Sequence, residues 1–138
     1  MNKLRLKIPA RIETGRLILR PYGPGDGPVL FQAGARNRVH LKTYESGNFL
    51  CHFKSEAQAE ETARSLGIEW QARKLFFWGL FEKATDRWVG QIYVGPTNWD
   101  LPEYTLGYVS DAAFEGRGLI SEAVVRILEV LFRDMKAQ

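Results

Sequence analysis

A short stretch with two glycines, Gly116 and Gly118, is the part of this sequence best suited to chemistry. It lies between a β-rich run that ends at Ser110 and the longest amphipathic helical pattern of the chain. Glycine lets the backbone turn tightly and approach a ligand, and the start of a helix offers unpaired N–H groups and the positive end of its dipole. The stretch is therefore a candidate anion site. A turn that only joins a strand to a helix has the same Gly-x-Gly spacing, and the triplet taken alone favours that interpretation.

Two common phosphate-binding motifs do not fit this stretch. The dinucleotide fingerprint Gly-x-Gly-x-x-Gly would need its third glycine at Ser121, and no second βαβ unit follows. A P-loop needs a lysine and then a serine or threonine directly after the last glycine, where this chain has Leu119 and Ile120. What remains is a strand, a short turn and a helix, whose successive backbone amides can surround a pyrophosphate.

The elements that must position this stretch follow from the hydrophobic period. Runs rich in β-formers predict strands over residues 16–20, 75–81, 88–94 and 104–110, and the middle two are spaced as a hairpin. Helical spacing predicts helices over residues 26–37, 55–73 and 118–136. Asp26 and Ser55 are the expected N-caps, and Gln58 completes a capping box with Ser55. Residues 38–53 have no steady period and are predicted to form a loop over a ligand site, while residues 96–102 are predicted to form a turn.

The last helix carries the strongest pattern of the chain. Its predicted buried face consists of Leu119, Ala123, Val124, Ile127, Leu128, Leu131 and Met135. The order of elements has no internal repeat and predicts a single domain over residues 1–138. Its class is mixed α/β or α+β, with a largely antiparallel sheet flanked by helices.

Composition limits the classes of function. The 138 residues are 45% hydrophobic and carry a formal net charge of +3, which suits a small anionic ligand and does not indicate nucleic acid. A single cysteine, Cys51, and two histidines exclude an internal disulfide framework and metal sites built from several histidines. No run of residues is apolar and long enough for a signal peptide or a membrane span. We therefore expect a cytoplasmic protein with no metal and no membrane partner.

Four segments of the sequence resemble those of the GCN5-related N-acetyltransferases, and in particular the branch that acetylates ribosomal-protein N-termini. Thr14–Pro21, Trp88–Ile92 and Leu106–Val109 are similar to the family's first, third and fourth strands, and Glu115–Ile120 to its Gln/Arg-x-x-Gly-x-Gly/Ala motif. The resemblance covers almost the whole chain. Two residues depart from the motif, since Glu115 replaces a glutamine or arginine and Ile120 replaces a glycine or alanine.

The resemblance implies that acetyl-CoA binds along the fourth strand and at the glycine turn. The residues it assigns to this cosubstrate are Val109 and Ser110, through amides near the pantetheine, and Gly116, Arg117, Gly118, Leu119 and Ile120, around the phosphates. The implied reaction is direct attack of a primary amine, on a protein N-terminus or a small molecule, on the acetyl thioester. The acceptor pocket has four aromatic candidates, for which packing is the alternative: Phe49, Phe53, Trp78 and Trp99.

The reaction needs a base that takes a proton from the ammonium of the acceptor. Thr105 stands where many relatives have a glutamate just before the Ile-Gly-Tyr-like segment. Because strand side chains alternate, Glu103 shares a face with Thr105 and is the candidate base, directly or through water. A solvated carboxylate at the end of the strand is the alternative.

Relatives continue with further strands after the last helix, so the resemblance implies a sheet that lacks its C-terminal strands. Either the chain is a piece of a longer protein, or another chain supplies the missing strand. An exposed strand edge invites pairing, and we therefore expect a homodimer or a strand swap. The alternatives to an enzyme are a non-catalytic CoA-binding or interaction module, and a structural domain whose glycine turn binds nothing.

Overall fold

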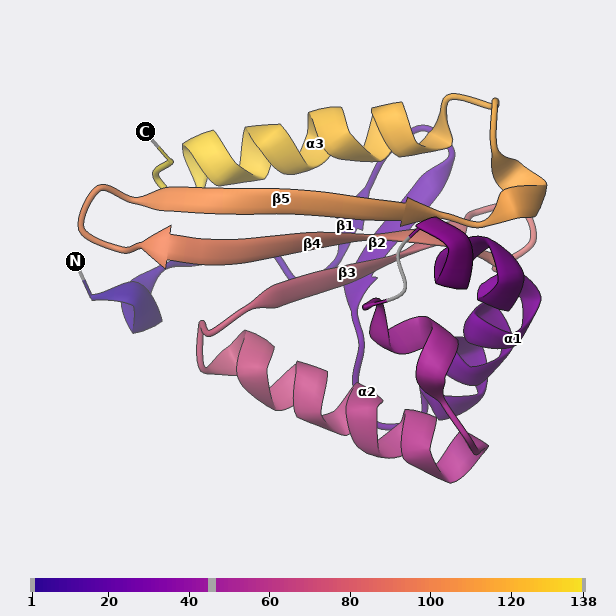
Figure 1. The fold of residues 1–138 in the computed structure, drawn as a ribbon. Coiled ribbons are helices and arrows are strands. Elements are labelled where there is room, and N and C mark those ends of the chain that lie inside the picture. The colour runs from indigo at the N-terminus through magenta and orange to yellow at the C-terminus, as the bar shows by residue number, and fades with distance from the viewer. Residues whose placement is uncertain (1, 45–46, 138) are drawn as a thin grey trace.

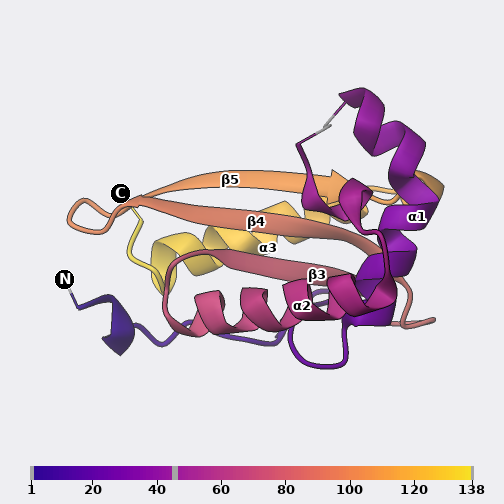
Figure 2. The same ribbon diagram turned by 60° about the horizontal axis from the view of Figure 1, so that its bottom comes forward.

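The computed structural model describes residues 2–44 and 47–137, which form a five-stranded antiparallel sheet with helices on both faces. The strands are β1 (Ile12–Glu13), β2 (Leu17–Pro21), β3 (Phe76–Glu82), β4 (Trp88–Asn98) and β5 (Glu103–Ser110). The helices are α1 (Gly27–Tyr44), α2 (Glu56–Gln71) and α3 (Leu119–Arg133), and the short 3-10 helices are η1 (Lys3–Arg5), η2 (Phe49–His52) and η3 (Ala112–Phe114). Figure 1 and Figure 2 show α3 on one face of the sheet and α1 with α2 on the other. The predicted fold class is confirmed, and none of the described helices is long and apolar enough to cross a membrane.

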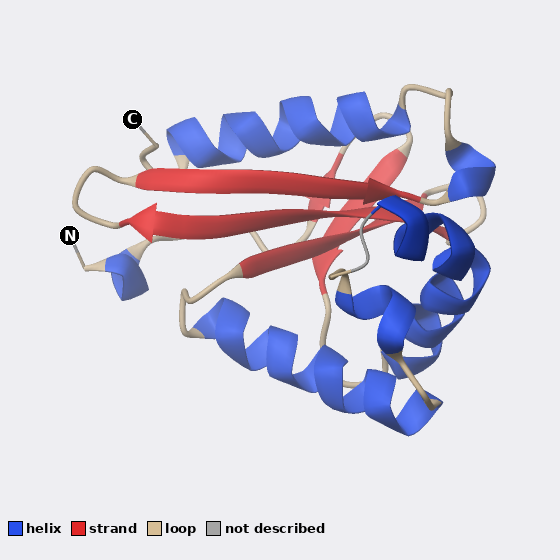
Figure 3. Cartoon of the chain, in the orientation of Figure 1, coloured by secondary structure: helices blue, strands red, loops and turns tan. Residues whose placement is uncertain are grey.

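The strands follow one another in the sheet in sequence order, each antiparallel to the next (Figure 3). β4 and β5 form the longest pair, with Gly90 opposite Ser110 at one end and Asn98 opposite Glu103 at the other. The register shifts between Pro96 and Asn98, where proline has no N–H for the ladder. The turn predicted from residue 96 therefore starts only after Asn98. Within the described part of the chain β5 pairs with β4 alone, so its outer edge is open.

Side chains alternate between the two faces of the sheet and build a hydrophobic core on each. On the α3 face, Trp78 and Ile92 are fully buried and belong to one core with Ile127 of α3. On the opposite face, Val109 of β5 belongs to a second core with Leu30 of α1. β5 therefore contributes side chains to the cores on both faces of the sheet. Its C-terminal end lies next to α1 and to the start of α3.

α1 begins directly after Asp26, as predicted, but the Asp26 carboxylate has another role. It accepts two hydrogen bonds of 3.0 Å from the Arg20 guanidinium and one of 2.8 Å from the backbone N–H of Gly23. Glu60 of α2 accepts instead from the N–H of Gly27 at the start of α1. The cap of α1 therefore comes from a neighbouring helix.

The capping box predicted for α2 is present in a shifted form. Ser55 Oγ accepts from the N–H of Gln58 at 3.1 Å, as expected. The Gln58 side chain accepts from the N–H of Lys54 at 2.7 Å, one residue before the expected partner.

The predicted end of α1 near residue 37 is wrong, and so is the loop predicted over residues 38–53. α1 continues to Tyr44, and η2 occupies Phe49–His52. Residues 45 and 46 of the predicted loop lie outside the described residues.

The reason for the longer helix is a polar residue at a core position. Asn37 is 2% exposed, and its side-chain N–H₂ donates to the carbonyl of Ala33 at 2.9 Å and to Asp111 at 3.2 Å. Its oxygen accepts from the N–H of Ala112 at 3.0 Å. Leu41, one helical turn later, is fully buried. The hydrophobic period stops at Asn37 because a polar residue occupies this core position, and two of its hydrogen-bond partners, Asp111 and Ala112, lie beyond β5 in the sequence.

α3 lies within the predicted range, and most of its predicted face is buried. The residues that bear this out are Leu119, Ala123, Ile127, Leu131 and Met135, and Val124 is half-buried. Leu128, also predicted to be buried, is 40% exposed, and Val130 is fully buried instead. Apolar residues of α3 occupy more than one of its faces, so the hydrophobic period alone does not show which face is buried. Val125, Leu128 and Phe132 remain exposed, and we call them the outer α3 face.

Candidate functional site

The glycine turn, residues 115–118, leads from η3 into α3. Gly116 and Gly118 have φ angles of 79° and 74°, in the left-handed region that other residues rarely adopt. Gly118 is the N-cap residue of α3, and no described side chain forms a cap hydrogen bond there. A pocket of about 370 Å³ lies beside the turn, with Ser110 and Ile120 in its lining. Open backbone amides and the positive end of α3 therefore border a hollow that suits an anion.

The two residues that depart from the family motif leave these amides available. The Glu115 carboxylate lies 3.8 Å from Nε2 of His40 in α1. The Ile120 side chain is directed at β4, where a Cβ placed on Gly90 would lie 3.0 Å from Ile120 Cδ1. Both residues border the pocket, but the glutamate extends toward α1 and the isoleucine fills space that Gly90 leaves.

Arg16, just before β2, connects the turn to the start of that strand. Its Nη1 donates to the backbone carbonyl of Arg117 at 2.9 Å, and its Nε donates to Glu122 at 2.9 Å. Thr14 Oγ1 and the Arg16 backbone N–H donate to the same carboxylate. The hydrogen bond from Thr14, followed by those from Arg16, lowers the pKa of Glu122 below its ordinary value, although partial burial opposes this. The first turn of α3 is thus held by a charged network.

The side chain of Arg117 lies on the outside of the turn. Its guanidinium stands 5.0 Å from the centre of the Phe114 ring, and its Nη1 is 3.9 Å from Glu82. Arg87 occupies a similar position, 4.9 Å from the same ring centre. Two guanidinium groups, those of Arg87 and Arg117, therefore contact the Phe114 ring close to the glycine turn.

The end of β5 adds backbone donors to the site. The Asp111 N–H donates to the carbonyl of Val89 at 2.8 Å, so Asp111 and Val89 form a hydrogen-bonded pair. Along an antiparallel ladder, hydrogen-bonded pairs alternate with non-hydrogen-bonded pairs. The N–H of Val109 therefore pairs with β4, whereas those of Tyr108 and Ser110 are directed at the open edge. Of the two predicted strand amides, only that of Ser110 is free of the ladder, and Tyr108 is a donor that the sequence did not reveal.

Asp111 fixes the junction between β5, η3 and α1. It is 2% exposed, and its Oδ2 accepts from Arg36 at 2.8 Å and 3.2 Å and from Asn37 at 3.2 Å. Its Oδ1 accepts from the N–H of Ala113 at 2.9 Å. Burial alone would raise the pKa of Asp111, but the hydrogen bonds from Arg36, Ala113 and Asn37 together lower it below its ordinary value.

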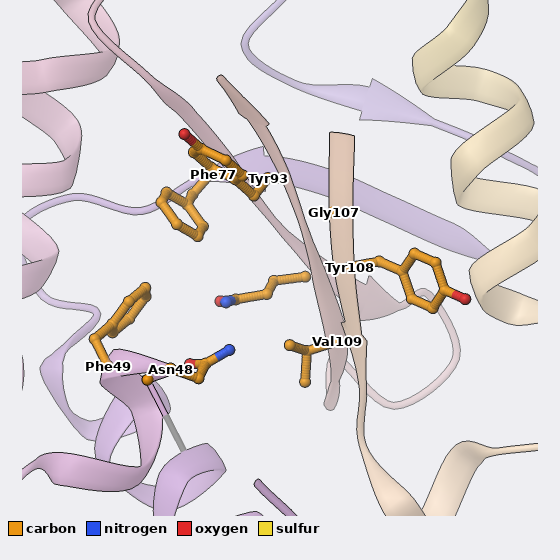
Figure 4. Close-up of a pocket in the computed structure, with 9 residues that line it drawn as sticks. Asn48, Phe49, Phe77, Tyr93, Gly107, Tyr108 and Val109 are labelled. Carbon is orange, nitrogen blue, oxygen red and sulfur yellow. The ribbon is translucent and has the colours of Figure 1, made fainter. Parts of the chain in front are cut away.

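A second hollow of about 250 Å³ lies between η2 and the strands β3, β4 and β5 (Figure 4). We call it the aromatic pocket. The ring centres of Phe49 and Phe77 are 5.3 Å apart, and those of Phe77 and Tyr93 are 4.9 Å apart. Tyr108 belongs to the lining of both this pocket and the hollow beside the glycine turn. The two hollows therefore lie on either side of Tyr108, whose ring is directed away from the aromatic pocket (Figure 4).

The structure brings one of the four predicted aromatic residues to this pocket. Phe49 lines it, whereas Phe53 borders a separate hollow against α2. Trp78 is fully buried in the core, and Trp99 packs edge-to-face on Tyr104 with ring centres 5.7 Å apart.

Seven lining residues were not predicted from the sequence: Gly47, Asn48, Phe77, Gln91, Tyr93, Gly107 and Tyr108. The strand alternation over residues 88–94 could have indicated that Gln91 and Tyr93 share a face with each other. It could not indicate which segment covers that face.

Glu103, the predicted base, is the first residue of β5 and is exposed. It borders a groove between β5 and α3 together with Leu128, and it does not line the aromatic pocket. Tyr108 lies five positions further along β5, which corresponds to roughly 17 Å along a strand.

The comparisons with known proteins concern nearly the whole chain. A family model described as Acetyltransferase (GNAT) domain matches residues 16–138, and no curated protein sequence matches. The ribosomal-protein-S5-alanine acetyltransferase from Vibrio fischeri superposes with a TM-score of 0.76 at 18% identity, over 91% of this chain and 68% of that one. The microcin C7 self-immunity acetyltransferase, in complex with acetyl-CoA and AMP, gives 0.79 at 14% identity, over 89% and 67%.

A third similar structure is a ribosomal L7/L12 alpha-N-protein acetyltransferase in complex with coenzyme A. Its TM-score is 0.75 at 19% identity, over 91% of this chain and 67% of that one. At these identities the likeness concerns the fold, and this chain spans about two thirds of the length of each structure.

Proposed function

Because the chain belongs to the acetyltransferase (GNAT) domain family, whose model matches residues 16–138, we propose that it transfers an acetyl group from acetyl-CoA to a primary amine. The observation that carries this proposal is the glycine turn at the start of α3, next to the open edge of β5. This surface combines three features. The two glycines of the turn are left-handed, α3 starts without a side-chain cap, and the N–H groups of Tyr108 and Ser110 are directed outward. This surface has the donors that an extended thioester with a pyrophosphate group needs.

The residues proposed to hold acetyl-CoA act mainly through their backbone. The N–H groups of residues 116–120 and the dipole of α3 would bind the pyrophosphate. Those of Tyr108 and Ser110 would bind the pantetheine along β5. Bound there, acetyl-CoA would supply an activated acyl group.

The chemistry follows from an amine and a thioester held side by side. The amine nitrogen forms a bond to the acetyl carbon, the carbon–sulfur bond breaks, and the leaving thiolate takes up the proton that the nitrogen releases, so that the products are the amide and CoA thiol. A base removes a proton from the ammonium beforehand, and N–H donors stabilise the oxyanion. The aromatic pocket has Tyr108 and Val109 of β5 in its lining, so it lies next to the strand proposed to hold the pantetheine, and we expect the amine to bind there.

Acetyl-CoA titration followed by an amine panel tests this function. Acetyl-CoA should raise the melting temperature of the protein, because a ligand that binds the folded state stabilises it. A primary amine should then cause release of free CoA thiol. No rise in melting temperature at millimolar acetyl-CoA would contradict both catalysis and CoA binding.

A non-catalytic CoA-binding or interaction module is the second candidate. It is favoured by Thr105 at the usual position of the base and by the distance of Glu103 from the aromatic pocket. A rise in melting temperature without release of CoA in the presence of any amine would support this module and contradict the enzyme.

Glu103→Gln tests the candidate base directly. If the carboxylate accepts the proton, kcat should fall at least about ten-fold at saturating substrates while the acetyl-CoA affinity is unchanged. The distance of roughly 17 Å along β5 favours the other outcome, in which kcat is unchanged and Glu103 is a solvated strand-end residue.

We also propose a homodimer and a cytoplasmic location. The open edge of β5 and the outer α3 face are next to each other, and a groove lined by Leu106, Leu128 and Phe132 connects them. A second chain could continue the sheet there and cover the apolar side chains. The single, buried Cys51 is compatible with a reducing compartment.

A further inference from the structure

The aromatic pocket is neutral. Its described lining consists of aromatic rings, glycines, Val109 and the two amide side chains of Asn48 and Gln91, and none of these residues carries a charge. An ammonium group would meet aromatic rings here but no carboxylate. The orientation of the two amides decides what else the ligand must present.

The amide of Asn48 is fixed by the start of η2. Its Oδ1 accepts from the backbone N–H of Leu50 at 3.0 Å, in the N-cap position of this short helix. A backbone N–H can only donate, so the atom that faces it must be the oxygen. The N–H₂ end is therefore directed away from η2. Figure 4 shows the nitrogen of Asn48 directed into the space between Phe49 and Val109.

The amide of Gln91 is fixed by a chain of two buried hydrogen bonds. Trp88 Nε1 donates to the Tyr22 hydroxyl at 2.8 Å, and this hydroxyl lies 2.9 Å from Gln91 Oε1. The indole N–H can only donate, so the hydroxyl accepts from it, and the hydroxyl hydrogen is donated to Gln91 Oε1. Burial raises the pKa of Tyr22 far above its ordinary value, so this donor keeps its proton.

The consequence for Gln91 is that its oxygen is occupied and its nitrogen is not. The residue is 2% exposed and lines the aromatic pocket from β4. Within the described part of the chain, no acceptor is hydrogen-bonded to its Nε2. This nitrogen is not one of the fully enclosed polar atoms, so it is reached from the pocket, where a ligand can supply the acceptor.

We infer that Gln91 and Asn48 select an amine acceptor that carries a neutral carbonyl group next to its amino group, with an apolar side chain against Phe49, Phe77 and Tyr93. This inference rests on the proposed acetyl transfer. Two amide donors match the two lone pairs of a carbonyl oxygen. A carboxylate would lose its hydration without meeting a cation, and a plain alkylamine would leave the Gln91 donor unpaired.

Three acceptors that share a phenyl ring and a primary amine separate these cases: phenylalanine amide, phenylalanine and phenethylamine. With the wild-type chain, kcat/KM for phenylalanine amide should exceed that of each of the others at least ten-fold. Gln91→Glu keeps the oxygen that Tyr22 binds, and Asn48→Asp keeps the oxygen that caps η2. Each change should lower kcat/KM for phenylalanine amide at least ten-fold and reduce its advantage over phenethylamine, with an unchanged KM for acetyl-CoA.

Gln58→Glu is the matched control. It makes the same change of charge on exposed α2, where the Gln58 oxygen already accepts a hydrogen bond, and it should leave all three acceptors unaffected. An equal fall in kcat for all three acceptors in Gln91→Glu would overturn the inference, because the amide would then act on the acetyl group. A preference for phenylalanine over its amide would also overturn it.

A binding measurement separates this inference from the proposed function. The side-chain N–H₂ signals of Asn48 and Gln91 in ¹⁵N NMR spectra are assigned by their loss in the two variants. Phenylalanine amide should shift both signals in the wild-type chain, and phenethylamine should not. Shifts without acetyl transfer would support the pocket and overturn catalysis. Transfer without shifts would overturn the pocket assignment, and the absence of both would overturn both.

Discussion

Asp111 is a buried carboxylate that depends on several hydrogen-bond partners. It is buried between α1 and η3, and Arg36, Asn37 and a backbone N–H converge on its two oxygens. A buried carboxylate is stable only when such partners replace its hydration. In the sequence it is an ordinary polar residue after a strand, and its role follows from α1.

Asp111→Asn should lower the free energy of unfolding by about 2 kcal/mol at pH 7, since it removes charged hydrogen bonds at a buried position. The folded-state pKa of Asp111 is lowered, so its contribution is present above the unfolded pKa of about 3.9 and is lost as the pH falls through the folded value. The difference between the wild-type chain and the variant should therefore shrink as the pH falls below about 4. Urea unfolding at several pH values measures it.

Asp100→Asn, at an exposed position of the β4–β5 turn, is the control for this experiment. It should change stability by no more than about 0.5 kcal/mol. A gap between Asp111→Asn and wild type that stays constant down to pH 3 would show that the carboxylate charge does not contribute.

At the scale of elements, the glycine turn and α3 work as one unit. The left-handed conformation of Gly118 sets the direction in which α3 starts, and Arg16 holds the turn through the Arg117 carbonyl and Glu122. The amides of the first turn are directed by this local geometry. A change in backbone conformation should therefore affect acetyl-CoA binding more than a change in any side chain of the turn.

Gly118→Ala should lower the free energy of unfolding by about 1 kcal/mol, because an alanine at a φ of 74° is strained. It should weaken acetyl-CoA binding about ten-fold, measured by calorimetry, since the turn must relax and move its amides. Gly15→Ala is the control, because that glycine has open space around its Cβ position and no positive φ. Equal acetyl-CoA affinity in the two variants would count against the turn as the phosphate site.

At the scale of the whole molecule, the two faces of the sheet differ in how they are covered. α1 and α2 cover one face, while α3 covers the other and leaves Val125 and Phe132 exposed at 59% and 60%. Phe132 borders the groove beside the open edge of β5, together with Leu106 of that strand. Such an arrangement is typical of a surface that another strand or chain covers.

Phe132→Glu should therefore separate the proposed dimer. The wild-type chain should have a mass near twice the 15.8 kDa of one chain by light scattering, and the variant should raise the dimer dissociation constant at least about ten-fold. Ile68→Glu, on α2 and 70% exposed, should leave the mass unchanged. A wild-type mass of one chain at micromolar concentration would contradict the dimer.

The sequence by itself determined the features that depend on near neighbours along the chain. The hydrophobic period placed three helices and four of the strands, Ser55 and Gln58 marked the start of α2, and the glycine pair marked the turn before α3. Each of these signals acts over a few residues, since hydrogen bonds in helices and turns join residues three or four apart.

Only the tertiary structure decided the features that depend on distant partners. Asn37 continues α1 because Asp111 binds it, and Gln91 presents its nitrogen because Tyr22 and Trp88 occupy its oxygen. The aromatic pocket is likewise assembled from η2 and three strands. A side chain of the same type has a different role wherever its partners differ, and no local pattern records which distant residues the fold brings to it.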